Sequence, residues 1–146
     1  MPDLFQALVE QAPDAVIFAD RDGNIRLWNP AAERLFGHAA PDVLGQRLDI
    51  IIPERLRRAH WDAFDRALAT GATRYHGRTM TTRSMHKDGR KLFVDLSFAL
   101  VTDESGSVVG ALAIGRDSTA RYEEHRSLVE RLAALERGVA ATPPPE

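Results

Sequence analysis

The feature that most constrains the fold is a set of three strand-like runs that follow one another along the C-terminal half of the chain. The runs cover residues 78–85, 91–101 and 108–116, and only short turns separate them. The first turn contains Asp88-Gly89, a strong signal for a hairpin. Parallel strands need a crossover connection of about a dozen or more residues, so strands joined by such short turns must be antiparallel neighbours. This half of the chain therefore predicts a three-stranded antiparallel meander.

A second hairpin is predicted near the N-terminus. Residues 15–19 form a short apolar strand, residues 20–23 a tight turn that ends in Gly23, and residues 24–28 the return strand. Helical segments follow, and the first of them begins with Asn29 as N-cap and Pro30 as its first residue. Two strands, then helices, then three strands indicate an α+β domain with one antiparallel sheet and helices on one face.

Segments outside this domain are predicted at both ends. Residues 1–12 contain a short amphipathic helix that covers a sheet face or pairs with a second copy, residues 13–118 form the domain, and residues 142–146 are a flexible tail. Residues 119–141 form a second amphipathic helix. Leu128, Leu132, Leu135 and Val139 follow one another in it at intervals of four, three and four residues. This spacing is typical of a coiled-coil seam, but also of a helix that lies on its own domain, and both interpretations stay open.

Composition excludes several classes of protein. The 146 residues carry a net charge of -2 and include no cysteine, which excludes disulfides, covalently attached haem, thiolate metal sites and cysteinyl-flavin photochemistry. The charge gives no reason to expect nucleic acid as a partner. There is no apolar run near the ~20 residues of a membrane span and no signal peptide, so a cytoplasmic protein is expected. No catalytic motif is present, and the prediction is that the chain is not an enzyme.

A long helix predicted over residues 54–69 places one histidine on its apolar stripe. His60 shares this stripe with Leu56, Phe64, Ala63 and Ala67, so it is expected to point inward. The last strand has small residues on one face, namely Ala111, Ala113 and Gly115. These small residues of the strand lie opposite small residues of the helix, which suggests space for a flat ligand between helix and sheet. The alternative is a helix packed closely on the sheet, with His60 as a hydrogen-bonded core histidine.

The other histidines are weaker candidates. His38 and His86 are predicted to lie at the surface, and His125 at an interface or in solvent. His76 lies in a loop and is a fallback ligand.

Three motifs in order resemble the PAS domain. They are PDAVIFADRDGNIRLWNPAAERLFG at 13–37, KDGRKLFVDLS at 87–97 and GRDSTARYEE at 115–124. The resemblance covers residues 13–119 and implies the PAS fold, a five-stranded antiparallel sheet with helices on one face and a C-terminal signalling helix. It also implies sensing rather than catalysis. The amphipathic N- and C-terminal helices favour a homodimer formed through them.

The segment RAHWDAFDRALATGATRYHG at 58–77 resembles haem-binding PAS oxygen sensors of the FixL type. The resemblance implies that His60 is the axial ligand of a haem b iron. It also implies roles for other residues: Arg66 and Arg74 at the propionates, and Leu96, Phe98 and Ala113 on the cofactor wall. Met80 stands where these sensors have an oxygen-binding arginine, and Arg78 where related sensors have an iron-binding methionine. Either side chain is therefore a candidate for the distal side, and Met80 for the sixth ligand.

Three hypotheses follow. The leading one is a haem-based sensor of O2, CO or NO, or of redox state, that relays its signal through the C-terminal helix. The second is a cofactor-free PAS dimerisation module in which His60 belongs to the core. The third is a PAS domain that binds a small organic metabolite.

Overall fold

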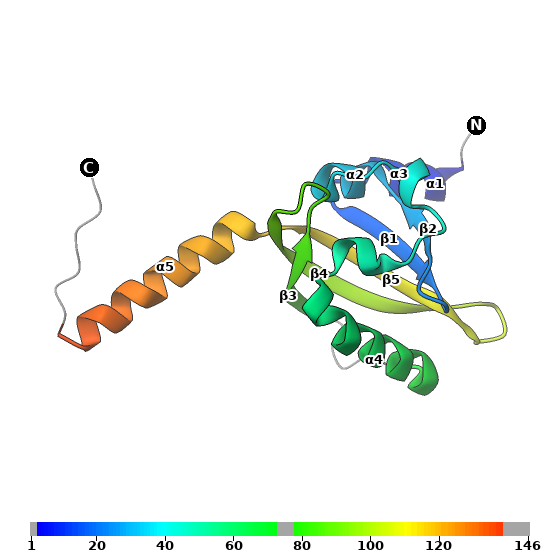
Figure 1. Ribbon diagram of the computed structural model, residues 1–146. Coiled ribbons are helices and arrows are strands. Elements are labelled where there is room, and N and C mark those ends of the chain that lie inside the picture. Colours follow the sequence, from blue (N-terminus) through cyan, green and yellow to red (C-terminus); the bar gives the residue numbers. More distant parts are fainter. Residues whose placement is uncertain (1–2, 73–77, 139–146) are drawn as a thin grey trace.

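The computed structural model describes residues 3–72 and 78–138 (Figure 1). These residues form the following elements in chain order: α1 (Leu4–Gln11), β1 (Ala15–Asp20), β2 (Ile25–Trp28), α2 (Pro30–Phe36), α3 (Ala40–Val43), the 3-10 helix η1 (Leu48–Ile51), α4 (Glu54–Thr70), β3 (Thr79–Met85), β4 (Lys91–Thr102), β5 (Val108–Asp117) and α5 (Thr119–Glu136). The predicted α+β class is confirmed.

The five strands form one antiparallel sheet in the order β2-β1-β5-β4-β3. The last strand in sequence is therefore central, because β1 pairs with it on one side and β4 on the other. This pairing joins the two predicted hairpin regions into one sheet. Helices α2, α3 and α4 lie on one face of it, as predicted (Figure 1).

The cap signals around α2 act as the sequence predicts. Asn29 Oδ1 accepts a hydrogen bond of 3.0 Å from the Ala32 amide, and Pro30 occupies the first helical turn. Gly37 ends the helix with a φ of 80°, a conformation that strains other residues.

The hydrophobic core occupies only one end of the sheet. Its buried residues come from β1, β2, β4 and the segments from α2 to η1: Ala15, Ile17, Ile25, Trp28, Ala32, Phe36, Val43, Ile51, Leu92 and Val94. Helix α4 is described along its whole length, and none of its residues is buried. Ala63, predicted on the inward stripe, is exposed, so that prediction was wrong. Helix α4 covers the other end of the sheet without closing on it.

Helix α5 projects away from the sheet and does not lie on its own domain (Figure 1). Leu128, Leu132 and Leu135 are 52%, 58% and 60% exposed. The interpretation of a helix packed along its own domain is therefore wrong for Thr119–Glu136, while Val139 and the predicted tail at 142–146 lie outside the described residues. Within the described ranges, no helix combines the length and the apolar content needed to span a bilayer.

Candidate functional site

A cavity of about 230 Å³ lies between α4 and the inner face of the sheet. Its wall is mostly apolar and is contributed by four strands and by the helical segments that cover them: Ile17, Ala19, Phe36, Leu48, Ile51, Ile52, Leu56, His60, Phe64, Thr82, Arg83, Ser84, Leu96, Phe98, Ala111, Leu112 and Ala113. The cavity occupies the region that the core leaves unfilled. It is a candidate ligand site, because ligand sites are concave, largely apolar and carry few polar groups.

Strand register explains the floor of the cavity. Ala113 on β5 lies opposite Phe98 on β4 and Ile17 on β1, so the three share the inner face. The small side chains of Ala111 and Ala113 leave space above the central strand. Gly115 does not, because the Leu96 side chain occupies the position where a Cβ of Gly115 would project. The open part of the floor is therefore shorter than the small-residue run suggests.

His60 lines the cavity from α4. Its ring lies edge-on to Trp61 at a centroid distance of 4.7 Å and stacks on Phe64 at 6.2 Å. Nδ1 is buried and has no hydrogen-bond partner among residues 3–72 and 78–138, in contrast to the hydrogen-bonded core histidine of the alternative. Burial lowers the pKa of His60, nearby Arg47 lowers it further, and Asp49 opposes them. The ring is therefore neutral near pH 7, as metal coordination requires.

Trp61, next to His60, anchors α4 to the rest of the domain. Its Nε1 donates a hydrogen bond of 2.7 Å to Asp49 Oδ1, and the Arg47 guanidinium lies 4.1 Å from the ring centroid. The indole packs on Gly23, where any side chain would collide with it. The sequence offers no signal for this set of contacts, because the residues come from separate segments.

The predicted cofactor residues are only partly brought together. Leu96, Phe98 and Ala113 line the cavity with His60. Met80 pairs with Leu96, so it lies on the inner face of β3, but it is not one of the lining residues.

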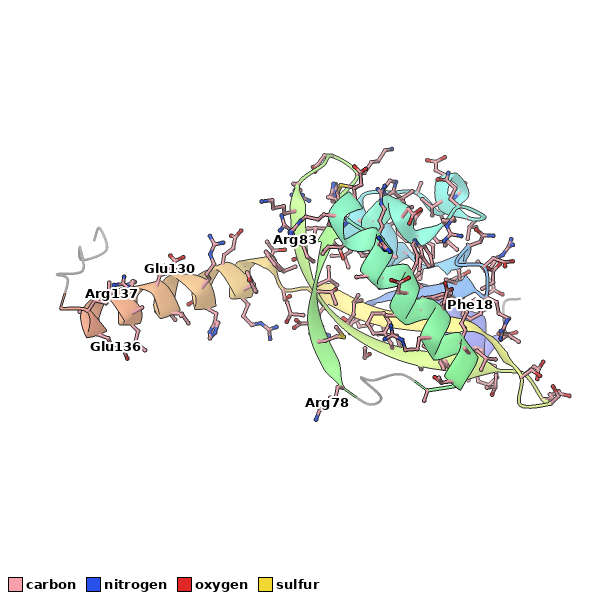
Figure 2. All side chains as sticks on the ribbon, turned by 60° about the horizontal axis from the view of Figure 1, so that its bottom comes forward. Phe18, Arg78, Arg83, Glu130, Glu136 and Arg137 are labelled. Atoms are coloured by element: carbon pink, nitrogen blue, oxygen red, sulfur yellow. The ribbon has the colours of Figure 1, made fainter. Side chains whose placement is uncertain are left out.

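Two of the predicted arginines, Arg66 and Arg78, are not among the residues that line the cavity. Arg66 and Arg78 are exposed, and Figure 2 shows Arg78 at the far end of β3, pointing away from the domain. Arg74 and the fallback ligand His76 lie outside the described residues.

Sequence reasoning missed a polar strip on β3. Thr82, Arg83 and Ser84 all line the cavity, opposite the apolar side of α4. The Thr82 hydroxyl donates to the Val94 carbonyl over 3.2 Å, while Ser84 is buried. Arg83 Nε is buried without a hydrogen-bond partner in the described part of the chain. Thr82 and Ser84, which are polar residues at alternate positions of one strand, were the available signal.

His38 and His86, predicted to lie at the surface, are half-buried. The turn between β3 and β4 docks on the end of α2, where the Lys87 amide donates to the Phe36 carbonyl over 2.8 Å. The His86 side chain is only 15% exposed and packs on Gly37. His38 Nε2 is buried and lacks a partner among the described residues. Burial lowers the pKa of His38, nearby Lys87 and His86 lower it further, and Asp42 opposes them.

These lowered pKa values predict that the free energy of unfolding falls in mild acid. An unfolded histidine has a pKa of about 6.5, whereas His38 and His60 bind protons more weakly when folded, so the unfolded state takes up more protons as the pH falls. Their contribution to stability is present above pH ~6.5 and is lost below it. Urea titrations at neutral and mildly acidic pH measure the loss. The variant with both His38→Gln and His60→Gln should show a shallower pH dependence, and an unchanged slope would contradict the assignment.

The sequence matches the PAS fold family over residues 9–123. The chain belongs to the PAS family. This confirms the resemblance identified from the motifs. The PAS domain is 31% identical over 143 residues to the oxygen sensor protein DosP of Escherichia coli, which covers 96% of this chain and 18% of DosP. It is 30% identical over 131 residues to the sensor protein FixL of Bradyrhizobium diazoefficiens, covering 90% of this chain and 25% of FixL.

A third relative is the signal transduction histidine-protein kinase AtoS of Escherichia coli, which is 30% identical over 132 residues, with 88% of this chain and 20% of AtoS covered. The chain thus spans a quarter or less of the length of these relatives. They identify it as a PAS sensor domain of the kind found in signalling proteins.

Solved structures agree on the fold. A PAS domain from Colwellia psychrerythraea has a TM-score of 0.69 at 24% identity and covers 81% of this chain and 99% of that one. An RNA-binding light-oxygen-voltage receptor has a TM-score of 0.70 at 26% identity and covers 92% of this chain and 38% of that one.

Proposed function

We propose that this PAS domain binds haem b through His60 and senses O2, CO or NO, or the redox state of the iron. The observation that carries the proposal is a neutral histidine with an unpartnered, buried Nδ1 in the wall of an apolar cavity. Two of the relatives are named as an oxygen sensor and as FixL, which supports the same chemistry. When bound, haem supplies the iron that binds a diatomic gas or changes oxidation state.

The residues of the chain suit this group in type. His60 offers an imidazole from α4, and Leu96, Phe98 and Ala113 offer an apolar wall on the sheet. Arg66 and Arg74 are the candidate cations for the propionates, and Met80 and Arg78 are the candidates for the distal side. The cavity of about 230 Å³ lies below the usual range of about 300–1,000 Å³. We therefore expect α4 to move outward on binding, and its lack of buried residues makes this possible.

The signal would pass from the cavity to α5 through β4, because one face of this strand lines the cavity and the other contacts α5. Leu96 and Phe98 face the cavity, whereas Phe93 on the same strand holds the start of α5. The Ser118 amide donates to the Phe93 carbonyl over 2.8 Å, and the Phe93 amide donates to Thr119 Oγ1 over 2.9 Å. A shift of β4 on ligand binding thus reaches α5 directly.

The proposed setting follows from the same features. We infer a cytoplasmic sensor without catalysis of its own, and without nucleic acid or membrane as a partner. Apolar side chains on α1 and α5 support a homodimer, since Leu4, Phe5 and Leu8 are exposed together with the α5 leucines.

Absorption spectroscopy of protein expressed with added haem precursor tests the haem proposal. We expect a stoichiometric Soret band that is lost completely in His60→Ala, while the fold is retained by circular dichroism. His125→Ala is the matched control, because it removes an exposed histidine on α5 and should leave the band unchanged. A colourless protein that also fails to bind added hemin would contradict the proposal. The chain would then be a cofactor-free module or a metabolite sensor.

The cavity also supports a second candidate, a PAS domain that binds a small organic metabolite. Its volume suits a compact molecule, and the Ser84 and Thr82 side chains could hydrogen-bond to it. Mass spectrometry of the denatured protein detects a co-purified compound. We would expect Ser84→Ala to reduce its retention, with the exposed Ser105→Ala as the control.

A further inference from the structure

The row of exposed leucines on α5 continues toward the domain with polar residues at the same helical positions. The α5 seam consists of Leu128, Leu132 and Leu135, and Leu128 and Leu135 occupy equivalent heptad positions because they are seven residues apart. Arg121 lies seven residues before Leu128, so it occupies the same position one heptad earlier. A second helix that follows the seam toward the domain therefore meets Arg121.

The charges beside the seam favour a second copy of this chain in parallel orientation. Arg131 and Glu136 lie at the flanking positions that face each other across a parallel coiled coil. In a parallel, in-register pair Arg131 of each copy faces Glu136 of the other, with opposite charge. Glu130 and Arg137 lie on the outer side of the helix, and Figure 2 shows Glu130, Glu136 and Arg137 projecting from α5 without contact to the domain.

Arg121 also has a partner on the sheet. Its Nη2 forms an ion pair with Asp95 Oδ2 on β4. Asp95 is well placed to hold it, because its side chain is only 15% exposed and its Oδ1 accepts a 2.7 Å hydrogen bond from the Thr81 hydroxyl. That hydrogen bond lowers the pKa of Asp95, and Arg121 adds to the effect. Tyr122 stacks on Phe93 beside the pair, at a centroid distance of 3.7 Å.

This ion pair connects the cavity to the seam. Asp95 lies on β4 directly before Leu96, which lines the cavity from the opposite face. We propose that the Asp95–Arg121 pair controls how far the α5 seam closes toward the domain in a parallel homodimer. The inference rests on the proposed dimer and not on the identity of the ligand.

Two charge states of the seam follow. While Asp95 holds Arg121, the guanidinium is neutralised and turned toward its own sheet, so the pair of helices closes over Leu128 and beyond. When β4 shifts and the ion pair separates, two Arg121 side chains with like charge face each other at equivalent positions. Their repulsion and the exposed charge at the seam open the first turns, while the pairing near Leu135 persists.

Disulfide cross-linking tests the proposal on the whole chain, because the sequence contains no cysteine. Leu128→Cys, Leu135→Cys and the outward control Glu130→Cys are each equilibrated with glutathione, and the fraction of covalent dimer gives the effective concentration of the two thiols. A parallel, in-register pair brings identical seam positions together. We therefore expect cross-linking of Leu128→Cys and Leu135→Cys and little of Glu130→Cys.

The Asp95→Asn variant separates the ion pair while it keeps a side chain of the same shape. We expect the effective concentration of Leu128→Cys to fall about tenfold, which corresponds to about 1.4 kcal/mol, with little change for Leu135→Cys. In an Arg121→Leu background the fall should disappear, because no charge is left to expose.

The possible outcomes distinguish the role of the ion pair from the existence of the parallel dimer. Equal effects of Asp95→Asn at both cysteine positions, or an effect that survives Arg121→Leu, would overturn the role of the ion pair. Absence of a Leu135→Cys cross-link would overturn the parallel dimer itself. Neither result bears on haem binding, which the Soret band reports separately.

Discussion

Replacing Asn29 with alanine should lower the free energy of unfolding by about 2–4 kcal/mol. Asn29 is 3% exposed and uses every polar atom of its side chain. Its Oδ1 accepts from the amides of Val16 and Ala32 over 2.9 and 3.0 Å, and its Nδ2 donates to the carbonyls of Val9 and Asp14 over 2.9 and 3.1 Å. Alanine removes the cap of α2 and leaves buried backbone groups without partners. Urea denaturation measures the change.

Asn29→Asp is the matched variant. It keeps an acceptor for the amides of Val16 and Ala32 but loses the donor to Val9 and Asp14. We expect α2 to be retained, whereas α1 loses its hydrogen bond to the residue 29 side chain. Protection of α1 amides from hydrogen exchange should then fall more than protection of α2 amides. Equal stability of Asn29→Ala and the parent would show that water replaces these contacts.

Phe36→Ala should lower the free energy of unfolding by about 3–5 kcal/mol. Phe36 is fully buried, packs against Trp28 at a centroid distance of 5.4 Å and forms part of both the core and the cavity wall. Its removal costs the burial of the ring and leaves a void that the docked β3–β4 turn cannot fill. A domain of ordinary stability, about 5–15 kcal/mol, would be close to unfolding. Thermal and urea denaturation both report the loss.

Phe5→Ala provides the control for Phe36→Ala. Phe5 is 78% exposed on α1, so the same substitution should change the stability of the isolated chain little. If α1 belongs to the dimer interface, Phe5→Ala should instead weaken self-association, which sedimentation measures at several concentrations. A loss at Phe5 as large as that at Phe36 would contradict the placement of the core.

Much of the fold was predictable because its signals are local. Asn29-Pro30 begins α2, Asp88-Gly89 turns β3 into β4, and strand alternation places Leu96 and Phe98 on one face. These features depend on residues that are neighbours in sequence, where cap, turn and pleat preferences act. The strand order was not predicted, because the pairing of β1 with β5 joins segments that lie far apart in the sequence.

The remaining features depend on contacts between distant segments. The Trp61–Asp49 hydrogen bond, the packing of His86 on Gly37 and the Asp95–Arg121 ion pair have no local signature. Ala63 was misplaced because the whole apolar stripe of the helix was expected to face inward. Helix α4 instead faces a cavity, so only part of its stripe needs cover.

The loose seating of α4 has a thermodynamic consequence. A helix without buried residues has little packing to lose when it opens locally, so its amides should exchange faster than those of the sheet. A ligand that fills the cavity must then order this helix, and part of its binding energy is spent on that conformational entropy. The ligand-bound domain then differs from the free domain in rigidity as well as in shape. Slower amide hydrogen exchange along α4 would therefore report that the cavity is occupied, whatever the ligand is.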